Sequence, residues 1–539
     1  MFDSPFSHLF DRNQAVDASD IPTIHDLLSK PLENLDRLNS EIARLEAVLA
    51  KLKLERDEAQ NYVNAHQRLL SPSLRLPPEI LSEIFVHCLP EDCNAICSVS
   101  EAPLLLGLIC RNWRDVCIST SRLWSSIHIV IVNAHITRMC SEIDAKRLGV
   151  ELWLERSGLS PLSFSIHGSC NEPGIMLSRC IQQFLQCFIQ QVHRWQDVQL
   201  QLNAFCAHLF DASIATLPDL DQKLNLLHTL TFDFLSDIPT LPCLSKLLAA
   251  PHLRHVAVPN NIEHMQHHLE LLSPGLSQLI IHGGSRMRTD TQPYNPLHLL
   301  LRYKSLRACH FEIHTAWRGV FDFTLSVPNI PLPLMRDLSF HFVLPRSTSI
   351  DDLFKRMSTP SLRRLKVRIT PLPTRILEHA PFMPLLVDNQ IRELEMDLPL
   401  STSGYLECLI QSSGLTKLAI NCSRLKADAA KEIISRLIPS VKQPPLCPKL
   451  RHLTLTYPRV DDELMLDLAR SRMGIFDGMA LLEVLQVEFY GFKSLHIEGS
   501  LDELREQGMQ IRFDYFETEK RDRHSTRQQV AGDPYFLLF

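Results

Sequence analysis

Histidines at helical spacing are the first candidates for chemistry in this chain. His264 and His268 lie four residues apart, a spacing at which one helix face offers two imidazoles to a zinc ion. A zinc protease helix also needs a glutamate directly after the first histidine as the general base, and Met265 stands there. We therefore expect an ordinary surface helix at 264–268 and no metal site.

A second group of possible metal ligands comprises His87, Cys88, Cys93 and Cys97, and it lacks the paired C-x-x-C spacing of a zinc site. The sequence contains no G-x-S-x-G nucleophile motif, Walker loop or dinucleotide fingerprint. Glycine is scarce, with 17 residues in 539, although phosphate-cradling loops need it. We expect no catalytic residue, no metal and no cofactor, and hence a protein that is not an enzyme.

Two rows of charged side chains are candidates for binding rather than catalysis. The basic row is Arg364, Lys366 and Arg368, and the acidic row is Glu393, Glu395 and Asp397. Alternate residues of a strand point to the same face, so each row would line one strand. On neighbouring strands about 4.8 Å apart, the rows would form a ladder of opposite charges. We favour this structural role; the alternative is a docking patch for a charged segment of a target protein.

The charged rows belong to a longer repeat that must position them. The pattern apolar-x-x-apolar-x-apolar recurs ten times, with starts 23 to 35 residues apart. The repeats start at Leu227, Leu253, Leu276, Leu306, Met335, Leu362, Ile391, Leu415, Leu450 and Leu482. This array resembles leucine-rich repeats, although its spacing is looser and the asparagine of that motif is missing. One such unit cannot bury its apolar face alone, whereas stacked parallel strands backed by helices bury a continuous core.

The segments before the repeats follow the same order of helix and then strand. We expect helices over 138–157, ended by Gly158, and over 177–194, with strands over 162–166 and 195–200. The predicted fold over 129–516 is therefore an α/β solenoid, an irregular array of parallel strands and helices. A doubly wound enzyme sheet would need glycine-rich turns after its strands, and the sequence lacks them.

A short helical module is expected over 71–128. Two prolines suit a helix start, because proline fixes φ and has no backbone donor. Apolar residues then follow at helical spacing. The residues concerned are Leu76, Pro77, Pro78, Ile80, Leu81, Ile84 and Phe85. Farther along come the segment 110–117, which carries Trp113, and the pair Leu123 and Trp124.

Taken together, these segments resemble the F-box, a three-helix module that binds the Skp adaptor of cullin-based ubiquitin ligases. The resemblance covers about a tenth of the chain, and the whole layout is similar to the expanded F-box family of fungi. It implies that Leu76, Pro77, Pro78, Ile80, Leu81, Ile84, Phe85 and Trp113 form the adaptor-binding and internal packing surface. It also implies a substrate receptor whose repeat array binds a protein target. The stretch 91–103 is longer than the usual link of the family.

A heptad pattern precedes this module in the segment 21–70 and predicts one long helix of about 38 residues. Its apolar seam is Leu35, Leu38, Ile42, Leu45, Leu49 and Leu52. Pro31 would suit the first turn of this helix. In a parallel homodimer Glu41 would face Glu46 of the other copy, and this repulsion disfavours such a coiled coil. The alternative is an amphipathic helix that lies on the protein itself or on the adaptor.

Composition limits the remaining possibilities. Apolar residues make up 45% of the chain and the net charge is −6, so we expect no general attraction to nucleic acid or anionic membranes. No apolar run is long enough to span a bilayer, and the N-terminus lacks the basic region of a secretory signal. We therefore expect a cytoplasmic or nuclear protein with a flexible segment 1–20 and a charged tail 517–539. The competing hypothesis is a repeat scaffold with no role in ubiquitin transfer.

Overall fold

The structure is a computed structural model of the chain, and it divides into two compact units, Met1–Leu81 and Ser82–Phe539. It describes residues 4–7, 10, 16–70, 72–132, 139–170, 174–234, 241–259, 268–282, 297–314, 329–343, 350–370, 376–423, 425–439, 446–474, 478–490, 493–494 and 496–516. None of the described helices is long and apolar enough to cross a membrane.

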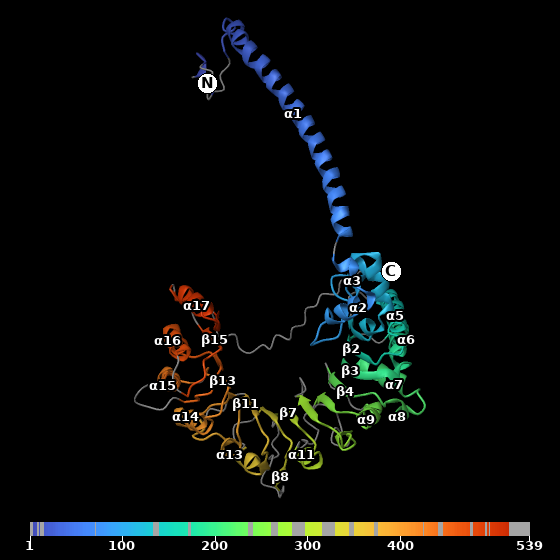
Figure 1. The fold of residues 1–539 in the computed structure, drawn as a ribbon, viewed down its shortest axis with the longest axis vertical. Coiled ribbons are helices and arrows are strands. Elements are labelled where there is room, and N and C mark those ends of the chain that lie inside the picture. The colour runs from blue at the N-terminus through green and yellow to red at the C-terminus, as the bar shows by residue number, and fades with distance from the viewer. Residues whose placement is uncertain are drawn as a thin grey trace. The chain divides into compact units, whose positions relative to one another are not determined.

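The first unit consists mainly of helix α1 (Ile21–Leu69), followed by the short 3₁₀ helix η2 (Pro72–Arg75) (Figure 1). The predicted long helix is confirmed, and the six seam residues are 44–55% exposed. The expectation that Pro31 lies in the first turn is wrong, since the helix begins ten residues earlier at Ile21. Pro31 therefore lies inside α1, where it cannot donate the backbone hydrogen bond that other helical residues make.

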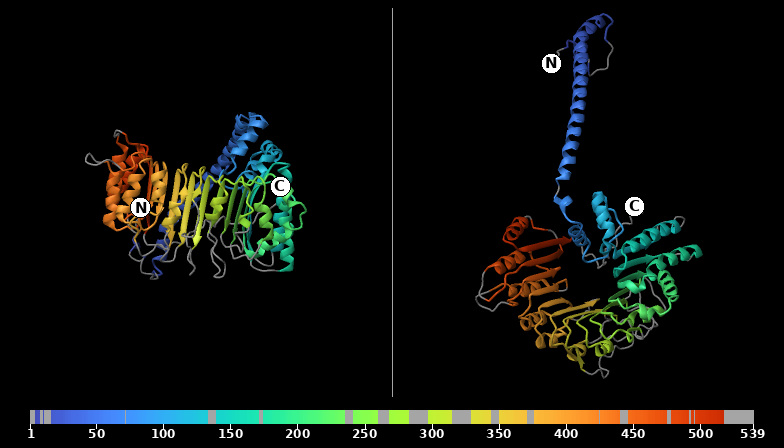
Figure 2. Two further views of the ribbon diagram at one scale, coloured as in Figure 1. Left: turned by 90° about the horizontal axis from the view of Figure 1, so that it is seen from below. Right: turned by 45° about the vertical axis from the view of Figure 1, so that its right-hand side comes forward.

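The second unit contains a parallel sheet of fourteen strands that follow one another in chain order. Figure 2 shows these strands side by side. They are β1 (Ser126–Val132), β2 (Leu162–Ser169), β3 (Trp195–Leu202), β4 (Thr229–Phe234), β5 (His255–Pro259), β6 (Gln278–His282), β7 (Ala308–His314), β9 (Asp337–Val343), β11 (Arg364–Thr370), β12 (Glu393–Asp397), β13 (Lys417–Asn421), β14 (His452–Thr456), β15 (Val484–Tyr490) and β16 (Gln510–Phe516). Strands β8 (Ile330–Pro331) and β10 (Met357–Ser358) form a separate parallel pair.

Helices connect the strands and lie along one face of the sheet (Figure 1). They are α5 (Met139–Arg156), α6 (Ile175–Ile189), α7 (Ala204–Ile214), α8 (Leu220–Lys223), α9 (Pro242–Leu248), α11 (Leu297–Arg302), α12 (Asp351–Lys355), α13 (Met383–Asp388), α14 (Thr402–Gln411), α15 (Ala427–Leu437), α16 (Asp462–Met473) and α17 (Ile497–Glu506). Helices α2 (Pro78–His87), α3 (Leu104–Ile109) and α4 (Arg111–Ser119) precede the sheet.

The ten predicted repeats all become consecutive strands of this sheet. Every one of their thirty apolar pattern residues is buried, with no more than 4% of its surface exposed. A buried leucine contributes about 1.5–3 kcal/mol, so the stacked repeats share one large core. An α/β solenoid of parallel strands and helices is therefore confirmed as the architecture of this unit.

Several elements differ from their predicted form. Strands β1 and β16, at the two ends of the sheet, escaped the sequence analysis, and β1 begins within the segment assigned to the helical module. The helix predicted over 177–194 is α6 followed by the separate 3₁₀ turn η4 (Val192–Arg194). The predicted strands at 162–166 and 195–200 are confirmed as parts of β2 and β3, and Gly158 ends the preceding helix with a φ of +55°.

Candidate functional site

Helix α2 carries most of the residues predicted to bind the adaptor. Its start follows the proline pair, where the Pro77 carbonyl accepts hydrogen bonds from the backbone N–H groups of Ile80 and Leu81. Pro77, Pro78 and Ile80 are exposed, and Leu76 is half-buried. Leu81 is buried. Any part that Leu81 plays in adaptor binding would therefore come from packing rather than from direct contact.

The part of α2 that belongs to the second unit alternates between exposure and burial. Ile84 is exposed, whereas Phe85 is fully buried and packs against Trp113 of α4 with ring centroids 4.9 Å apart. Cys110 caps the start of helix α4, and its Sγ accepts a hydrogen bond from the Trp113 backbone N–H. Trp113 is thus a half-buried support of the module.

The helical module exposes further apolar side chains that the sequence analysis did not assign to binding. They are Leu105, Leu108 and Ile109 of α3 and Ile118 of α4, each at least 40% exposed. Large apolar side chains gathered on one small module are typical of protein interaction surfaces. Leu105, Leu108 and Ile109 belong to the apolar run 102–110, which is too short to span a bilayer and which the sequence analysis did not connect with binding.

A tryptophan pair joins the module to the repeat array. Trp124 donates a hydrogen bond from its Nε1 to the Cys117 carbonyl at 2.8 Å. Its ring meets Trp153 of α5 edge to face at 4.8 Å, and the Arg156 guanidinium lies 4.5 Å from the ring centroid. Because both tryptophans are buried, the end of the module around Trp124 packs directly on the first repeat within the second unit.

The long link 91–103 also joins the sheet. Ile96 forms a parallel bridge with His128 of β1, and the His128 backbone N–H donates to the Ala95 carbonyl at 2.7 Å. Asn94 donates to Ser165 Oγ of β2. Burial lowers the pKa of His128, with a smaller contribution from His167, so its imidazole favours the neutral form. The extra length of the link thus covers the first edge of the sheet.

The predicted charge ladder is formed on β11 and β12, which are neighbours in the register that pairs the basic row with the acidic row. Lys366 Nζ lies 2.6 Å from Glu395 Oε1, and Arg368 Nε lies 3.0 Å from Asp397 Oδ2. Arg364 Nε lies 3.7 Å from Glu393 Oε1 and 2.7 Å from Asp337 Oδ1 of β9. The structural role expected of the rows is present, and their docking role stays a prediction.

A cavity of about 330 Å³ opens over this part of the sheet. Four of the six predicted target-binding residues line it, namely Arg364, Lys366, Glu393 and Glu395. Its lining also includes the small side chains Ala308, Ser339 and Ala419, and Lys417. Sequence reasoning missed these lining residues, because cavity shape depends on the neighbours that each strand acquires. The cavity offers charged groups of both signs and space for a peptide side chain.

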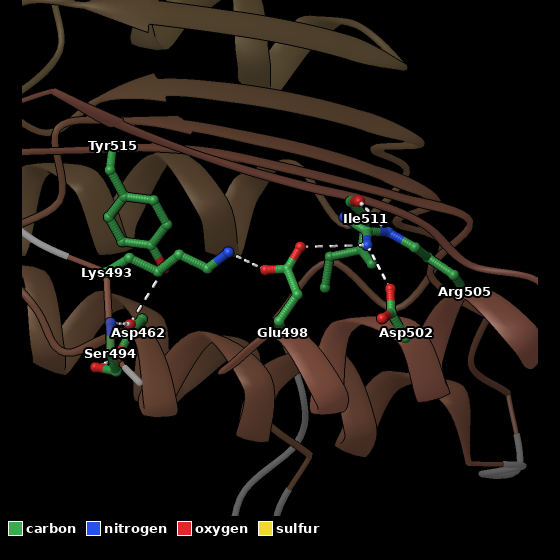
Figure 3. Close-up of polar contacts among 8 residues, drawn as sticks. All are labelled: Asp462, Lys493, Ser494, Glu498, Asp502, Arg505, Ile511 and Tyr515. Atoms are coloured by element: carbon green, nitrogen blue, oxygen red, sulfur yellow. Dashed lines mark hydrogen bonds and ion pairs between the residues drawn. The ribbon is translucent and has the colours of Figure 1, made fainter. Parts of the chain in front are cut away.

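The last repeat is closed by a polar cluster that contains a buried carboxylate (Figure 3). Asp462 accepts hydrogen bonds from Ser494 Oγ at 2.8 Å and from Tyr515 Oη at 3.1 Å. Burial raises the pKa of Tyr515, and Asp462 adds to this shift. Beside it, Lys493 pairs with Glu498, and Arg505 lies 2.7 Å from Asp502 Oδ1. These contacts link α16, α17 and β16, so the cluster has a structural role at the end of the array.

The candidate metal ligands can be compared only where the structure describes them. His264 and His267 lie outside the described residues, and the buried His268 shares a 2.6 Å hydrogen bond with Ser245 Oγ. Burial raises the pKa of the Cys97 thiol to about 12, so it stays protonated at neutral pH. Within the described ranges, no three His, Cys, Asp or Glu side chains could hold a metal ion together.

Comparison with known proteins adds no relative to this picture. No model of a known protein family matches the chain, and no curated protein matches it either. A functional assignment therefore draws on the residues, their placement and the sequence resemblance already described.

Proposed function

We propose that this chain is the substrate-recognition subunit of a Skp adaptor–cullin–F-box ubiquitin ligase. The observation that carries the proposal is the tryptophan joint between a helical module with exposed apolar side chains and an array with a charged cavity. The module would bind the adaptor, and the array would bind a protein target. Trp113 and Phe85 would support the adaptor-facing surface from below.

A receptor of this kind performs no covalent chemistry. It raises the effective concentration of a target lysine beside the ubiquitin-charged enzyme. A rigid joint serves this role, because a fixed geometry narrows the positions that the bound target can take. The packing of Trp124 on Trp153, together with the Ile96–His128 bridge, supplies such a joint.

A pull-down with the Skp adaptor tests the proposal. Wild-type protein and a Leu159→Asp control, altered at a side chain exposed outside the module, should bind equally. Ile84→Asp and Ile109→Asp should each reduce binding at least tenfold, because a buried unpaired carboxylate at a hydrophobic interface is unfavourable. Leu81→Asp would be a poor probe, since Leu81 is buried and its loss would disturb folding.

Two results would count against the receptor function. Failure of the wild-type protein to bind the adaptor would leave the repeat scaffold as the better hypothesis. Equal binding by Ile84→Asp and Ile109→Asp would place any adaptor contact elsewhere than on the helical module. Circular dichroism of each variant would confirm that the fold is retained.

A further inference from the structure

Three aromatic side chains gather where the last three strands of the sheet end. Tyr457 follows β14, Tyr490 ends β15 and Phe516 ends β16. The rings of Tyr457 and Tyr490 stack with centroids 4.1 Å apart and planes 9° from parallel. Phe516 lies 6.2 Å from Tyr457 at 68°. Tyr490 and Phe516 remain 36% and 38% exposed, so this aromatic platform presents ring surface to solvent.

The backbone holds Tyr457 in an unusual conformation to build the platform. Its φ is +56°, in the left-handed region that tyrosine rarely adopts. Its N–H donates to the Glu488 carbonyl at 2.7 Å, which continues the ladder between β14 and β15 past the end of β14. The change of backbone direction brings the Tyr457 ring over Tyr490.

Two carboxylates lie beside the platform. Glu488 and Asp514 are directly opposite each other on β15 and β16, two residues before Tyr490 and Phe516. Residues two apart in a strand share a face, so the carboxylates and the exposed rings lie on the same side of the sheet. Burial raises the pKa of Glu488, and the charge of Asp514 adds to this shift. A further positive charge beside Glu488 would therefore be favourable.

The basic side chains described in this region pair with acidic side chains other than Glu488. Arg512 pairs with Asp514 at 2.8 Å, so this carboxylate already has a cationic partner, and the charge of Arg512 partly offsets the rise in the pKa of Glu488. Lys493 pairs with Glu498, and Arg505 pairs with Asp502 (Figure 3). Among the described residues, no lysine or arginine forms an ion pair with Glu488. The carboxylate instead receives a hydrogen bond from the Tyr457 side chain.

We propose that the aromatic platform and Glu488 bind an arginine or lysine side chain in the docking segment of a target protein. A cation over an aromatic face is attracted by the ring quadrupole, and a neighbouring carboxylate strengthens that attraction. Arginine fits better than lysine, because its planar guanidinium stacks on a ring while donating to a carboxylate. The inference rests on the proposed function for the identity of the partner as a ligase target, and it names the chemistry that the array would recognise.

Fluorescence anisotropy with the full-length chain tests this site. The probe is the labelled peptide Gly-Ser-Arg-Gly-Arg-Ser-Gly, and its matched control carries citrulline in place of both arginines. The arginine peptide should bind at least tenfold more tightly. Glu488→Gln and Tyr490→Ala should each weaken its binding at least fivefold. Tyr490→Phe, which keeps the ring, and Gln486→Ala, on the same face of β15, should leave the affinity unchanged.

Other outcomes would overturn the site. Equal affinity for the arginine and citrulline peptides would mean that the platform does not select a cation. Unchanged binding by Glu488→Gln would remove the carboxylate from recognition. Binding that appears only after Lys520, Arg521 and Arg523 are changed to serine would make the chain's own tail the occupant and refute an external partner.

A parallel pull-down with the Skp adaptor separates this proposal from the ligase function. Glu488→Gln and Tyr490→Ala should retain adaptor binding, and Ile84→Asp should retain peptide binding. Peptide binding without any adaptor binding would support the platform while refuting the receptor. Adaptor binding without arginine selectivity would support the receptor while refuting the platform.

Discussion

At the scale of single residues, buried charged side chains join one repeat to the next. Arg472 of α16 is almost fully buried and donates to the carbonyl groups of Leu437, Leu446 and Cys447. Arg194 has the same role near the other end, where it donates to Ser157 Oγ and the Ser160 carbonyl. Burial lowers the pKa of both guanidinium groups. A leucine in these places would bury more apolar surface but would leave those acceptors unpaired.

Glu488 allows a pH-dependent prediction at this scale. Its folded-state pKa is raised, so its contribution to stability is greatest below the unfolded pKa near 4.5 and is lost as pH rises through the folded pKa. Glu488→Gln removes the like charge opposite Asp514 and should stabilise the protein at pH 7 by about 0.2–1 kcal/mol. The gain should shrink as pH falls toward 4.5, where Glu488 takes up a proton.

Urea unfolding of both proteins at pH 7 and pH 4.5 measures this difference. A variant that is less stable at pH 7, or an equal gain at both pH values, would contradict the repulsion between the two carboxylates. A stabilised variant that also loses peptide binding would show that the loss does not come from unfolding.

At the scale of elements, the charge ladder shows how the two-residue alternation of side chains along a strand produces contacts between neighbouring strands. Alternation alone places Lys366 and Glu395 on one face of their strands, and equal register then sets them opposite each other. Each neighbouring strand must enter the sheet in the same register, because a shift by one residue would bury a charged row. The ladder therefore favours the native register of β11 and β12.

The middle rung of the ladder offers a clean test, because its outer neighbours Ser339 and Ala419 are uncharged. Lys366→Glu and Glu395→Lys should each destabilise the protein, while the swapped double variant should recover most of the loss. We expect a coupling of about 0.2–1 kcal/mol, since both side chains are partly exposed. Chemical denaturation of the four proteins forms the double-mutant cycle.

The same variants separate the two roles of the ladder. If the swapped double variant loses as much unfolding free energy as the two single variants together, the ladder does not act through ion pairing. Loss of target capture by the swapped variant at restored stability would instead assign the rows to docking.

At the scale of the whole molecule, α1 is the element that we expect to decide whether copies of the chain associate. Its apolar seam is half-exposed, and Glu41 bonds to Arg44 of its own helix at 2.7 Å. A parallel dimer would bring Glu41 toward Glu46 of the second copy. We therefore expect the full-length chain to sediment as a monomer at micromolar concentration.

Glu46→Lys provides the matched gain-of-function control for this prediction. It would replace a repulsion by an attraction to Glu41 of the other copy and should increase self-association in analytical ultracentrifugation. A wild-type dimer, or a variant that is no more associated than the wild type, would contradict the assignment of seam and flanking positions.

The sequence by itself determined the parts of this protein that depend on local periodicity. The apolar pattern from Leu227 to Val487 located ten strands, and the heptads located α1. Even the pairing of Arg364 with Glu393 followed from alternation and equal strand spacing. These features are predictable because neighbours along the chain decide which face a side chain takes.

Only the tertiary structure decided the features that depend on contacts between distant segments. Strand β1 belongs to the sheet through its pairing with β2, and Trp124 acquires its role from Trp153. The aromatic platform needs Tyr457 at positive φ and three strand ends that meet. No local pattern encodes these arrangements, because their free energy comes from packing between residues that are far apart in the chain.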